Sequence, residues 1–529
     1  MYHNFVMTNN YDFQYDSCIS RGICSTNPRT SSLQEVLVLY LKLSSHYAFK
    51  LYEHGVLDEK IKVLILKSIS ILVSNPQFSE TDFKNLTQCF NSELPILISK
   101  YEKSCEEKGV EPEYLKSVIK CNKNLDIVKS IQLGEKEFLK KVKLLSQEVQ
   151  NLYRIIFVIA KSICINVLDL ESFETNSDVG YLTILELLNS LNIENVKTDE
   201  LKEIIIKATK LDNKLMKLLR NKQEERYGKQ RVNEVSYSTT PAKAILVVGS
   251  NIRELEDVLE AVKNQNIDVY THDEMMIAHT FPKFAEYKNL KGQYGQGLEN
   301  CLLDFATFPG PIVLTRHSLY NVENLYRGRL YTTDFASSKG VIPIKDKDFS
   351  DVIKAAKDAK GFKTGRHCES VSLGYDYDNS INLIEEKFSQ NKYSNIFIIG
   401  LNGYTLEQQT YFDKLLKQTP KDVLIISLSY CAQKENVICL NACFDIFATI
   451  EFAEGLKTKY SLPITVFYPK CDRHTLSQMI YLKQHDKINV YIGICTPILL
   501  NPNLMNTLEN IFQINELSSV KKDLAKILG

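Results

Sequence analysis

Titratable and polar side chains follow three short apolar runs in the middle of the sequence. Ala244–Val248, Asp268–Thr271 and Ile312–Thr315 are β-branched or apolar runs bounded by turn residues, which is typical of buried parallel strands. The polar residues that come next are Ser250, Asn251, His272, Asp273, Glu274, His317 and Ser318. In parallel sheets the chemistry gathers just beyond the carboxyl ends of the strands, so these side chains are predicted to form a titratable rim.

Two histidines with a carboxylate are a known arrangement for a mononuclear metal. His272, Glu274, His279 and His317 supply these donor types. A structural alternative explains the same residues, because histidine–carboxylate pairs often serve only to hold a local structure together. We favour this alternative, in which His272 and His279 stay beside Glu274 because they pack the turn from strand to helix.

The thirteen cysteines are scattered, and no two of them form a CxxC pair. A disulfide framework is not expected in a large chain without a secretion signal, so most of them are predicted to be reduced, buried and apolar in role. Two groupings stand out, Cys18 with Cys24 and Cys431 with Cys439 and Cys443. The wide spacing of the second group favours buried core thiols over metal ligation.

A glycine follows two of the predicted strands, Gly249 in VVGSN and Gly400 in IIGLNG. Neither turn has the GxGxxG spacing that lets the backbone approach a pyrophosphate, and the sequence has no GxxxxGK[ST] motif. These glycines are therefore interpreted as tight turns from strand to helix, and the repeated pattern resembles an internal duplication.

The first part of the chain has the period of amphipathic helices. Residues 1–28 are irregular, and a helix is predicted from Ser31, with Ser32 as a plausible cap and Gly55 beyond its end. Further helical patterns cover Glu59–Ser74, Ser79–Lys103, Glu111–Ser130, Glu135–Ile165, Gly180–Leu191 and Thr198–Tyr227. Residues 1–235 are therefore predicted to form a helical-bundle domain.

Strand–turn–helix alternation begins after Pro241 and returns after the polar segment KTGRHCES. The runs NIFIIG, DVLIISLSY, ITVFYP and KINVYIG predict the strands of the last part. The expected fold is multidomain, α and α/β. Its N-terminal helical-bundle domain is followed by two Rossmann-like parallel-sheet domains, over residues 243–362 and 368–529.

The composition excludes some classes of partner. Lys plus Arg equals Asp plus Glu at 64 each in the 529 residues, so no global field favours nucleic acid or an acidic membrane surface. The start MYHNFVMTNN has no basic or apolar targeting segment, and no apolar run approaches transmembrane length. A cytoplasmic protein is expected, with no nucleic-acid or membrane partner. A protein partner or a homo-oligomer is left open.

Several motifs in one order carry a family resemblance. They are VVGSNIREL, VYTHDEMMIAHTFP, LKGQYGQ, FPGPIVLT and LYTTD, with SCISRGICSTNPRTSSLQEVLVLYLK before them and IFIIGLNG, DVLIISLSY and ACFDIFATIEFAEGL after them. Together they resemble the hybrid-cluster proteins, also called prismane proteins or hydroxylamine reductases, which are relatives of nickel carbon monoxide dehydrogenase. The resemblance implies a helical domain and then two Rossmann-like domains, the same layout that the patterns predict.

The resemblance also implies a ligand set. The family holds an iron–sulfur–oxygen cluster with one His, two Glu and four Cys, one of them a persulfide. Matched position by position, Glu274 and Cys443 remain in this chain. The other five positions hold Ser250, Ser318, Leu401, Tyr430 and Pro469.

The family's N-terminal iron–sulfur cluster uses four cysteines, and this chain keeps Cys18 and Cys24 at the later two positions. Leucine and proline offer no donor side chain to iron, so we predict no cofactor and a degenerate active site. The expected protein is a pseudoenzyme, a family member repurposed for binding or as a scaffold. One alternative is a hydroxylamine or nitric oxide reductase with an altered iron–sulfur–oxygen site. A second is a mononuclear metal or small-molecule binding protein that reuses the old cavity.

Overall fold

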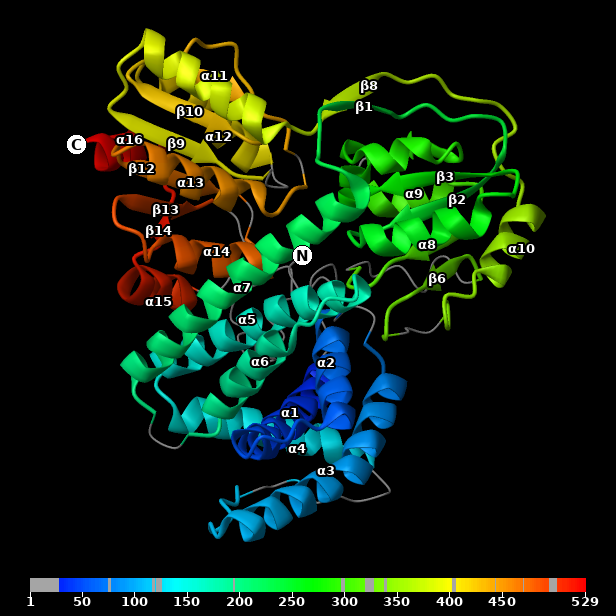
Figure 1. The fold of residues 1–529 in the computed structure, drawn as a ribbon, viewed down its shortest axis with the longest axis vertical. Coiled ribbons are helices and arrows are strands. Elements are labelled where there is room, and N and C mark those ends of the chain that lie inside the picture. Colours follow the sequence, from blue (N-terminus) through cyan, green and yellow to red (C-terminus); the bar gives the residue numbers. More distant parts are fainter. Residues whose placement is uncertain are drawn as a thin grey trace. The chain divides into compact units, whose positions relative to one another are not determined.

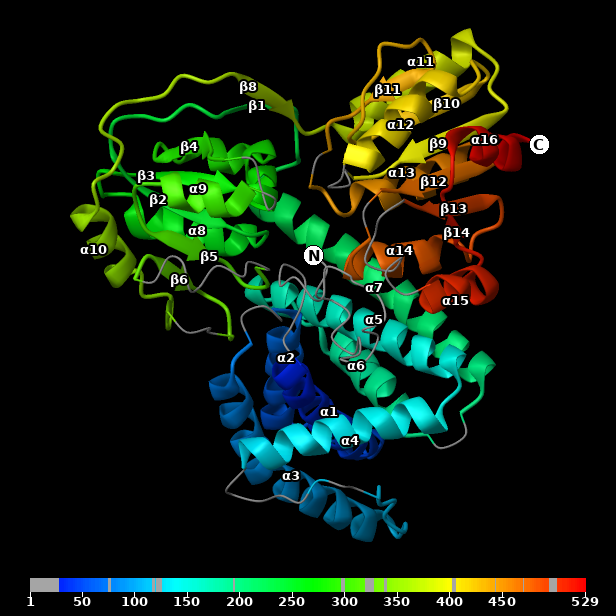
Figure 2. The ribbon, with the colours of Figure 1, turned by 180° about the vertical axis from the view of Figure 1, so that it is seen from behind.

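The computed structural model forms two compact units (Figures 1 and 2). One comprises Met1–Leu215, Arg316–Arg327 and Asp334–Pro343, and the other Met216–Thr315, Gly328–Thr333 and Ile344–Gly529. Within them the structure describes residues 28–74, 78–116, 119, 126–193, 196–295, 300–318, 328–336, 340–401, 406–442, 444–469, 471–493 and 502–529.

The first unit is built from helices. They are α1 (Pro28–Glu53), α2 (Glu59–Val73), α3 (Glu80–Lys108), α4 (Ile127–Leu144), α5 (Gln147–Ser172), α6 (Asp178–Ser190) and the first half of α7 (Thr198–Tyr227). Every side chain from Asn151 to Val167 of α5 is buried, which marks α5 as the core helix of the unit. No strand occurs among the described residues between 28 and 227, in agreement with the predicted helical bundle.

Local capping decides where several of these helices end, and it corrects two predicted boundaries. Glu111–Lys116 are not helical, so the helix predicted over 111–130 is wrong there; Gly109 ends α3 in the left-handed region at φ 66°. The long helix predicted over 135–165 is divided, because Ser146 caps α5 by accepting a hydrogen bond from Val149 N at 3.3 Å.

The later part of the chain forms two six-stranded sheets. The first has the order β4-β3-β2-β5-β6-β7. Its strands are β2 (Lys243–Val248), β3 (Ile267–His272), β4 (Leu290–Gln293), β5 (Ile312–Leu314), β6 (Leu330–Thr332) and β7 (Val341–Pro343). The helices along it are α8 (Ile252–Val262), η3 (Asp273–Thr280), η4 (Pro282–Glu286), α9 (Cys301–Thr307) and α10 (Ser350–Asp358). Ala244–Val248 are fully buried on both faces of the sheet, as expected for a central parallel strand.

The second sheet has the order β11-β10-β9-β12-β13-β14. Its strands are β9 (Asn395–Ile399), β10 (Val423–Ser427), β11 (Val437–Cys439), β12 (Ile464–Tyr468), β13 (Ile488–Ile492) and β14 (Asn515–Glu516). The helices are α11 (Tyr377–Gln390), α12 (Leu406–Gln418), α13 (Ala448–Lys459), α14 (Arg473–Leu482), α15 (Pro502–Phe512) and α16 (Val520–Leu528). Alternate residues such as Phe397 and Ile399 pack with α12 and α16, while α13 contacts β9 and β12.

Numbered along the chain, the strands of each sheet follow the same spatial order, 3-2-1-4-5-6, which is the Rossmann order. From β4 to β6 in the first sheet, and throughout the second, neighbouring strands pair in parallel. The predicted fold class, helical then two Rossmann-like sheets, is therefore confirmed. In this order the topological switch points lie between β2 and β5 and between β9 and β12.

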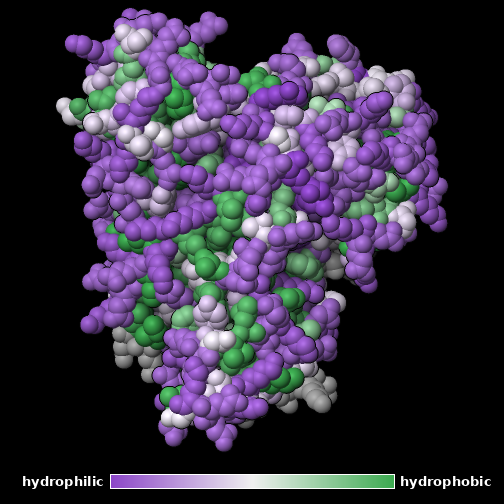
Figure 3. All heavy atoms as spheres, viewed as in Figure 1, coloured by the Kyte–Doolittle hydropathy of each residue, from purple (hydrophilic) through white to green (hydrophobic). Residues whose placement is uncertain are grey.

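Two short strands outside the six-stranded sheets pair with each other. β1 (Asn233–Ser236) and β8 (Ser370–Leu373) form a two-stranded antiparallel sheet. The predicted domain boundaries themselves stay predictions. Hydrophilic residues cover most of the face in Figure 3. No helix in the described part of the chain is long and apolar enough to cross a membrane.

Candidate functional site

The polar rim at the end of β3 is built around a buried histidine. β3 ends at His272 and η3 begins at Asp273, which takes a φ of 55°. The His272 side chain is fully buried, and its Nε2 lies 3.1 Å from Oδ2 of Asp304 on α9. The ring also meets Phe305 edge-on at 5.3 Å. These contacts anchor His272 to α9, so its ring ties the strand end to the neighbouring helix.

His279 has a different partner. Its Nε2 lies 2.9 Å from Oγ1 of Thr271, which also contacts Gln293. Burial lowers the pKa of His279 to about 4, so the imidazole is neutral at pH 7. The neutral ring accepts or donates one hydrogen bond at the strand end, a packing role rather than that of a charged catalytic group.

Glu274 is half-buried on η3 between these two histidines. His317 belongs to the other compact unit, so the predicted convergence of His272, Glu274 and His279 with His317 stays a prediction. Among the described residues, no three His, Cys, Asp or Glu side chains come close enough to hold a metal ion.

His317 and Asp334 form a second buried polar group, which belongs to the helical unit. His317 takes a φ of 64°, its backbone N donates to Oδ2 of Asp334 at 2.7 Å, and its Nε2 lies 2.9 Å from Oγ of Ser70. Ser74 also donates to Asp334. Burial raises the pKa of Asp334 to about 6. No sequence pattern pointed to a role for Asp334, although it ends the LYTTD motif that carries part of the resemblance.

Apolar side chains occupy the switch point of the second sheet. Leu401 follows β9 and Pro469 follows β12, two strands that pair directly. Leu401 is only 6% exposed, and the Pro469 carbonyl accepts a hydrogen bond from Gln408 Nε2 at 2.7 Å. Tyr430 stacks on Phe412, with ring centroids 4.9 Å apart and planes inclined by 21°. These residues complete the packing at the carboxyl end of the sheet.

The remaining ligand positions have unlike environments. Ser250 is exposed after β2, and Ser318 is buried. Asn251, the neighbour of Ser250, caps α8 by accepting hydrogen bonds from Arg253 N and Glu254 N, both at 3.1 Å. The other predicted positions, Cys443, Cys18 and Cys24, lie outside the described residues. A cavity shared by all seven positions therefore stays a prediction.

At the switch point of the second sheet, the side chains at the positions that the resemblance implies as ligands do not fit the family's cluster. Leu401 has no donor atom, and the side chain of Pro469 has none either. Tyr430 has a phenol oxygen, but its ring is committed to the core cluster with Phe412. Iron–sulfur chemistry needs thiolates at such positions, so the donor set differs in kind as well as in number.

The cysteines of the second sheet correct a prediction. Cys431 and Cys439 were expected to be buried core thiols, and both are exposed. The physical reason is their place in the sheet: Cys431 lies in the loop after β10, and Cys439 ends β11, which is an edge strand. Spacing along the sequence gave no signal for this edge position.

The second unit also contains a buried charge network that no sequence pattern indicated. Nη1 of Arg220 donates to Oδ2 of Asp445 at 2.7 Å, and its Nε donates to Oε1 of Glu224 at 3.0 Å. The hydroxyl of Tyr375 lies 3.0 Å from Asp445 Oδ2 and 2.8 Å from Glu451 Oε2. Burial and the nearby Asp445 raise the pKa of Glu451 to about 7.

The Tyr375 hydroxyl donates towards both carboxyl groups of this network, and Arg220 compensates the charge of Asp445. The proximity of Asp445 therefore makes the charged form of Glu451 less favourable. The network joins the end of α7 to the second sheet and serves structure.

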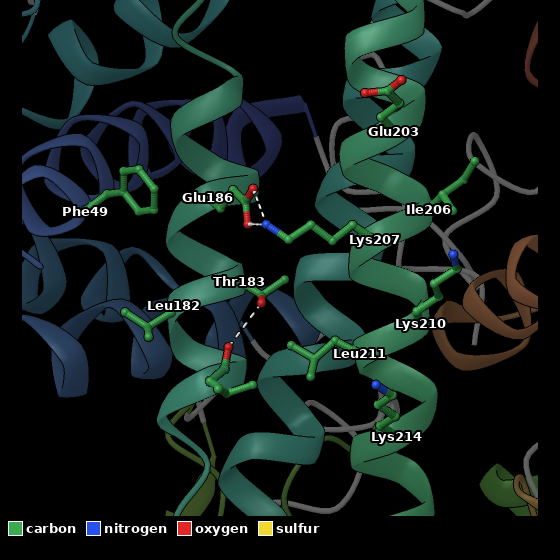
Figure 4. A pocket seen from close by; sticks show the side chains of 11 residues that line it. Phe49, Leu182, Thr183, Glu186, Glu203, Ile206, Lys207, Lys210, Leu211 and Lys214 are labelled. Atoms are coloured by element: carbon green, nitrogen blue, oxygen red, sulfur yellow. Dashed lines mark hydrogen bonds and ion pairs between the residues drawn. The ribbon is translucent and has the colours of Figure 1, made fainter. Parts of the chain in front are cut away.

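A groove of about 630 Å³ lies in the helical unit between α6 and α7 (Figure 4). Leu182, Leu211 and Phe49 line it, and Lys207 Nζ reaches across to Glu186 Oε1 at 2.7 Å. The hydroxyl of Thr183 donates to the Val179 carbonyl at 3.1 Å. The lining brings no nucleophile beside a base, so the groove offers apolar surface rather than catalytic groups.

The fold is a helical part followed by two sheets in the Rossmann order, with a polar rim at the first sheet. Similarity to known proteins identifies the family within this class. The model of the Prismane/CO dehydrogenase family matches residues 14–437. The hydroxylamine reductase of Acidiphilium cryptum is 26% identical over 96% of this chain and 95% of its own length. That of Thermodesulfovibrio yellowstonii is 23% identical over 97% and 98%.

The chain belongs to the Prismane/CO dehydrogenase family. The predicted resemblance is therefore confirmed. A solved structure of the alpha subunit of acetyl-CoA synthase/carbon monoxide dehydrogenase, described with nickel–zinc and nickel–nickel iron–sulfur clusters, aligns with 94% of this chain and 82% of its own. Its sequence identity is 12% and its TM-score is 0.48, too low for any inference about the site.

Proposed function

We propose that this member of the family carries no hybrid cluster and works as a binding or scaffold protein rather than as a reductase. The observation that supports the proposal is the donor set at the second switch point. Leu401 and Pro469 stand where the resemblance places cluster ligands, and neither side chain can bind iron. Both lie buried in the packed end of the sheet, so a nearby donor has no ready room to replace them.

The residues at the end of the first sheet give independent support for the same proposal. His272 is held by Asp304 and His279 by Thr271, so the histidines of the rim already have structural partners. The N-terminal cluster of the family needs four thiolates, and the resemblance leaves Cys18 and Cys24 for it. A chain that lost donors at both clusters has lost the site of reaction and the path for electrons together.

One observation favours a second candidate, a reductase with an altered iron–sulfur–oxygen site. The chain aligns over nearly its full length with two proteins named hydroxylamine reductase. In that case Glu274 and Cys443 would be the surviving ligands, and Ser250, Ser318 and Tyr430 would add oxygen donors.

Anaerobic purification followed by assays of iron, acid-labile sulfide and methyl-viologen-linked hydroxylamine reduction separates these candidates. Each assay is repeated after reconstitution with iron and sulfide, with the Acidiphilium cryptum relative purified in parallel as the positive control. We expect this chain to show background metal and no turnover, whereas the relative shows both cluster and turnover.

Variants make the test specific. Turnover that disappears in Glu274→Ala and in Cys443→Ala, but not in the exposed control Glu286→Ala, would overturn the proposal and establish the reductase. Turnover that all three variants retain would point to a contaminating enzyme. The proposal that this chain lacks the ligands for the cluster would then still hold.

A further inference from the structure

The thiols of Cys431 and Cys439 lie together on the second sheet. Cys439 ends the edge strand β11, where its partner in the neighbouring strand is Ser427 of β10. The Sγ of Cys439 lies 4.0 Å from the carbonyl oxygen of Ala432, the residue next to Cys431. Cys431 directly precedes Ala432 in the chain, so its thiol lies close to that of Cys439, and both side chains are exposed.

The loop between the two cysteines is anchored at two points, so their proximity is built into the fold. Asn436 is buried, and its Nδ2 donates to the carbonyls of Pro420 at 2.9 Å and Val423 at 2.7 Å. The ammonium of Lys434 donates to the carbonyls of Leu416 at 3.2 Å, Lys417 at 3.3 Å and Thr419. These bonds tie the loop to the end of α12 and the start of β10.

Solvent reaches this pair, unlike most of the other described thiols. Cys105, Cys164, Cys301 and Cys471 are buried. Burial raises the pKa of Cys301 to about 11, which makes that thiol unreactive. Cys89 is exposed on α3 but has no cysteine beside it in the described part of the chain, so it offers a matched single-thiol control.

We propose that Cys431 and Cys439 form a redox-active dithiol that small disulfides such as oxidised glutathione convert reversibly into an intramolecular disulfide. Two exposed thiols close together on an anchored loop are the arrangement that thiol–disulfide exchange requires. Cys439 is the attacking thiol, because the neighbouring Cys431 thiol lowers its pKa to about 7. The same proximity raises the pKa of Cys431, so that thiol stays protonated in the first step.

The exchange balances in two steps. The Cys439 thiolate attacks one sulfur of oxidised glutathione, the glutathione S–S bond breaks, and one glutathione leaves as a thiolate and takes up a proton. Cys431 then loses its proton and attacks Cys439 Sγ, which releases the second glutathione thiolate. The protein dithiol is oxidised by two electrons, and one oxidised glutathione is reduced to two thiols.

The test uses the full-length reduced protein, oxidised glutathione, quenching by alkylation and mass spectrometry of tryptic peptides. Cleavage after Lys434 separates Cys431 from Cys439, so a disulfide between them joins two peptides into one species. We expect this species to form several-fold faster than the mixed disulfide at Cys89, and to disappear on treatment with dithiothreitol.

Variants distinguish the roles of the two thiols. Cys431→Ser should trap a mixed disulfide with glutathione on Cys439, and Cys439→Ser should abolish both products. Cys89→Ser should change neither. Cys443→Ser should leave the joined species intact, because Cys443 shares a tryptic peptide with Cys439 and would otherwise be confused with it. Loss of the species in Cys443→Ser, or reaction of Cys439 no faster than Cys89, would overturn the proposal.

Discussion

The two parallel sheets share one strand order but differ in the residues at their carboxyl ends. The first sheet ends in buried polar side chains such as His272, which reaches Asp304. The second ends in Leu401 and Pro469, which are buried without any donor side chain. The same backbone plan therefore accepts a polar rim or an apolar one, provided that every buried polar group finds a partner.

The second sheet nevertheless has buried polar and charged side chains near it. One buried polar network in this part of the chain joins Arg220, Asp445, Tyr375 and Glu451. Fold alone does not fix the chemistry of a switch point, since side chains of a few positions decide it.

Removing the cation of that network should give the largest effect. Arg220→Met leaves Asp445 buried without its ion-pair partner, so we expect a loss of about 3–5 kcal/mol in the free energy of unfolding. Chemical denaturation measures it. Lys229→Met is the control, because Lys229 pairs with Asp378 at an exposed site and should cost less than about 1 kcal/mol. Equal losses in the two variants would show that the buried network contributes no more to the free energy of unfolding than an exposed ion pair.

The second sheet should lose stability as the pH rises. The pKa of Glu451 is about 7 in the folded protein, above the ordinary value of the unfolded chain, so its contribution is full at acid pH and is lost as the pH rises through 7. Between pH 5 and pH 8 this amounts to about 3 kcal/mol. Glu451→Gln should remove this part of the pH dependence in urea titrations, and an unchanged slope would contradict it.

The first sheet should respond to pH in the opposite direction. Burial lowers the pKa of His279 to about 4, below its value in the unfolded chain, so the folded state binds fewer protons. Stability is full above the unfolded pKa and is lost as the pH falls towards 4, by about 2 kcal/mol between pH 7 and pH 5. His279→Gln should flatten this acid limb while leaving the alkaline limb of Glu451 in place.

Restoring a single donor to the second switch point should have the smallest effect. Leu401→Cys shortens a buried side chain, so we expect a loss of about 1–2 kcal/mol in stability. Iron content after anaerobic reconstitution should stay at the level of the unchanged protein, because one thiolate does not rebuild a multi-ligand site. Stoichiometric iron in this variant would show that the neighbouring residues still form a cluster site.

The sequence by itself determined the fold class and the family. Apolar runs such as Ala244–Val248 specify buried parallel strands, because a strand covered on both faces must be apolar along its length. Helical periodicity was strong enough to place the first unit, although it missed the break at Ser146, where one hydroxyl caps a new helix. The family was recognised from the order of the motifs, because that comparison depends only on residue identities along the sequence.

Only the tertiary structure decided which side chains pair with one another. His272 pairs with Asp304, 32 positions away, and Arg220 with Asp445, 225 positions away, and no local pattern encodes such contacts. The exposure of Cys431 and Cys439 depends on β11 being an edge strand, which is a property of the sheet order. Burial and ion pairing arise from distant segments packed together, so they could not be read from spacing along the chain.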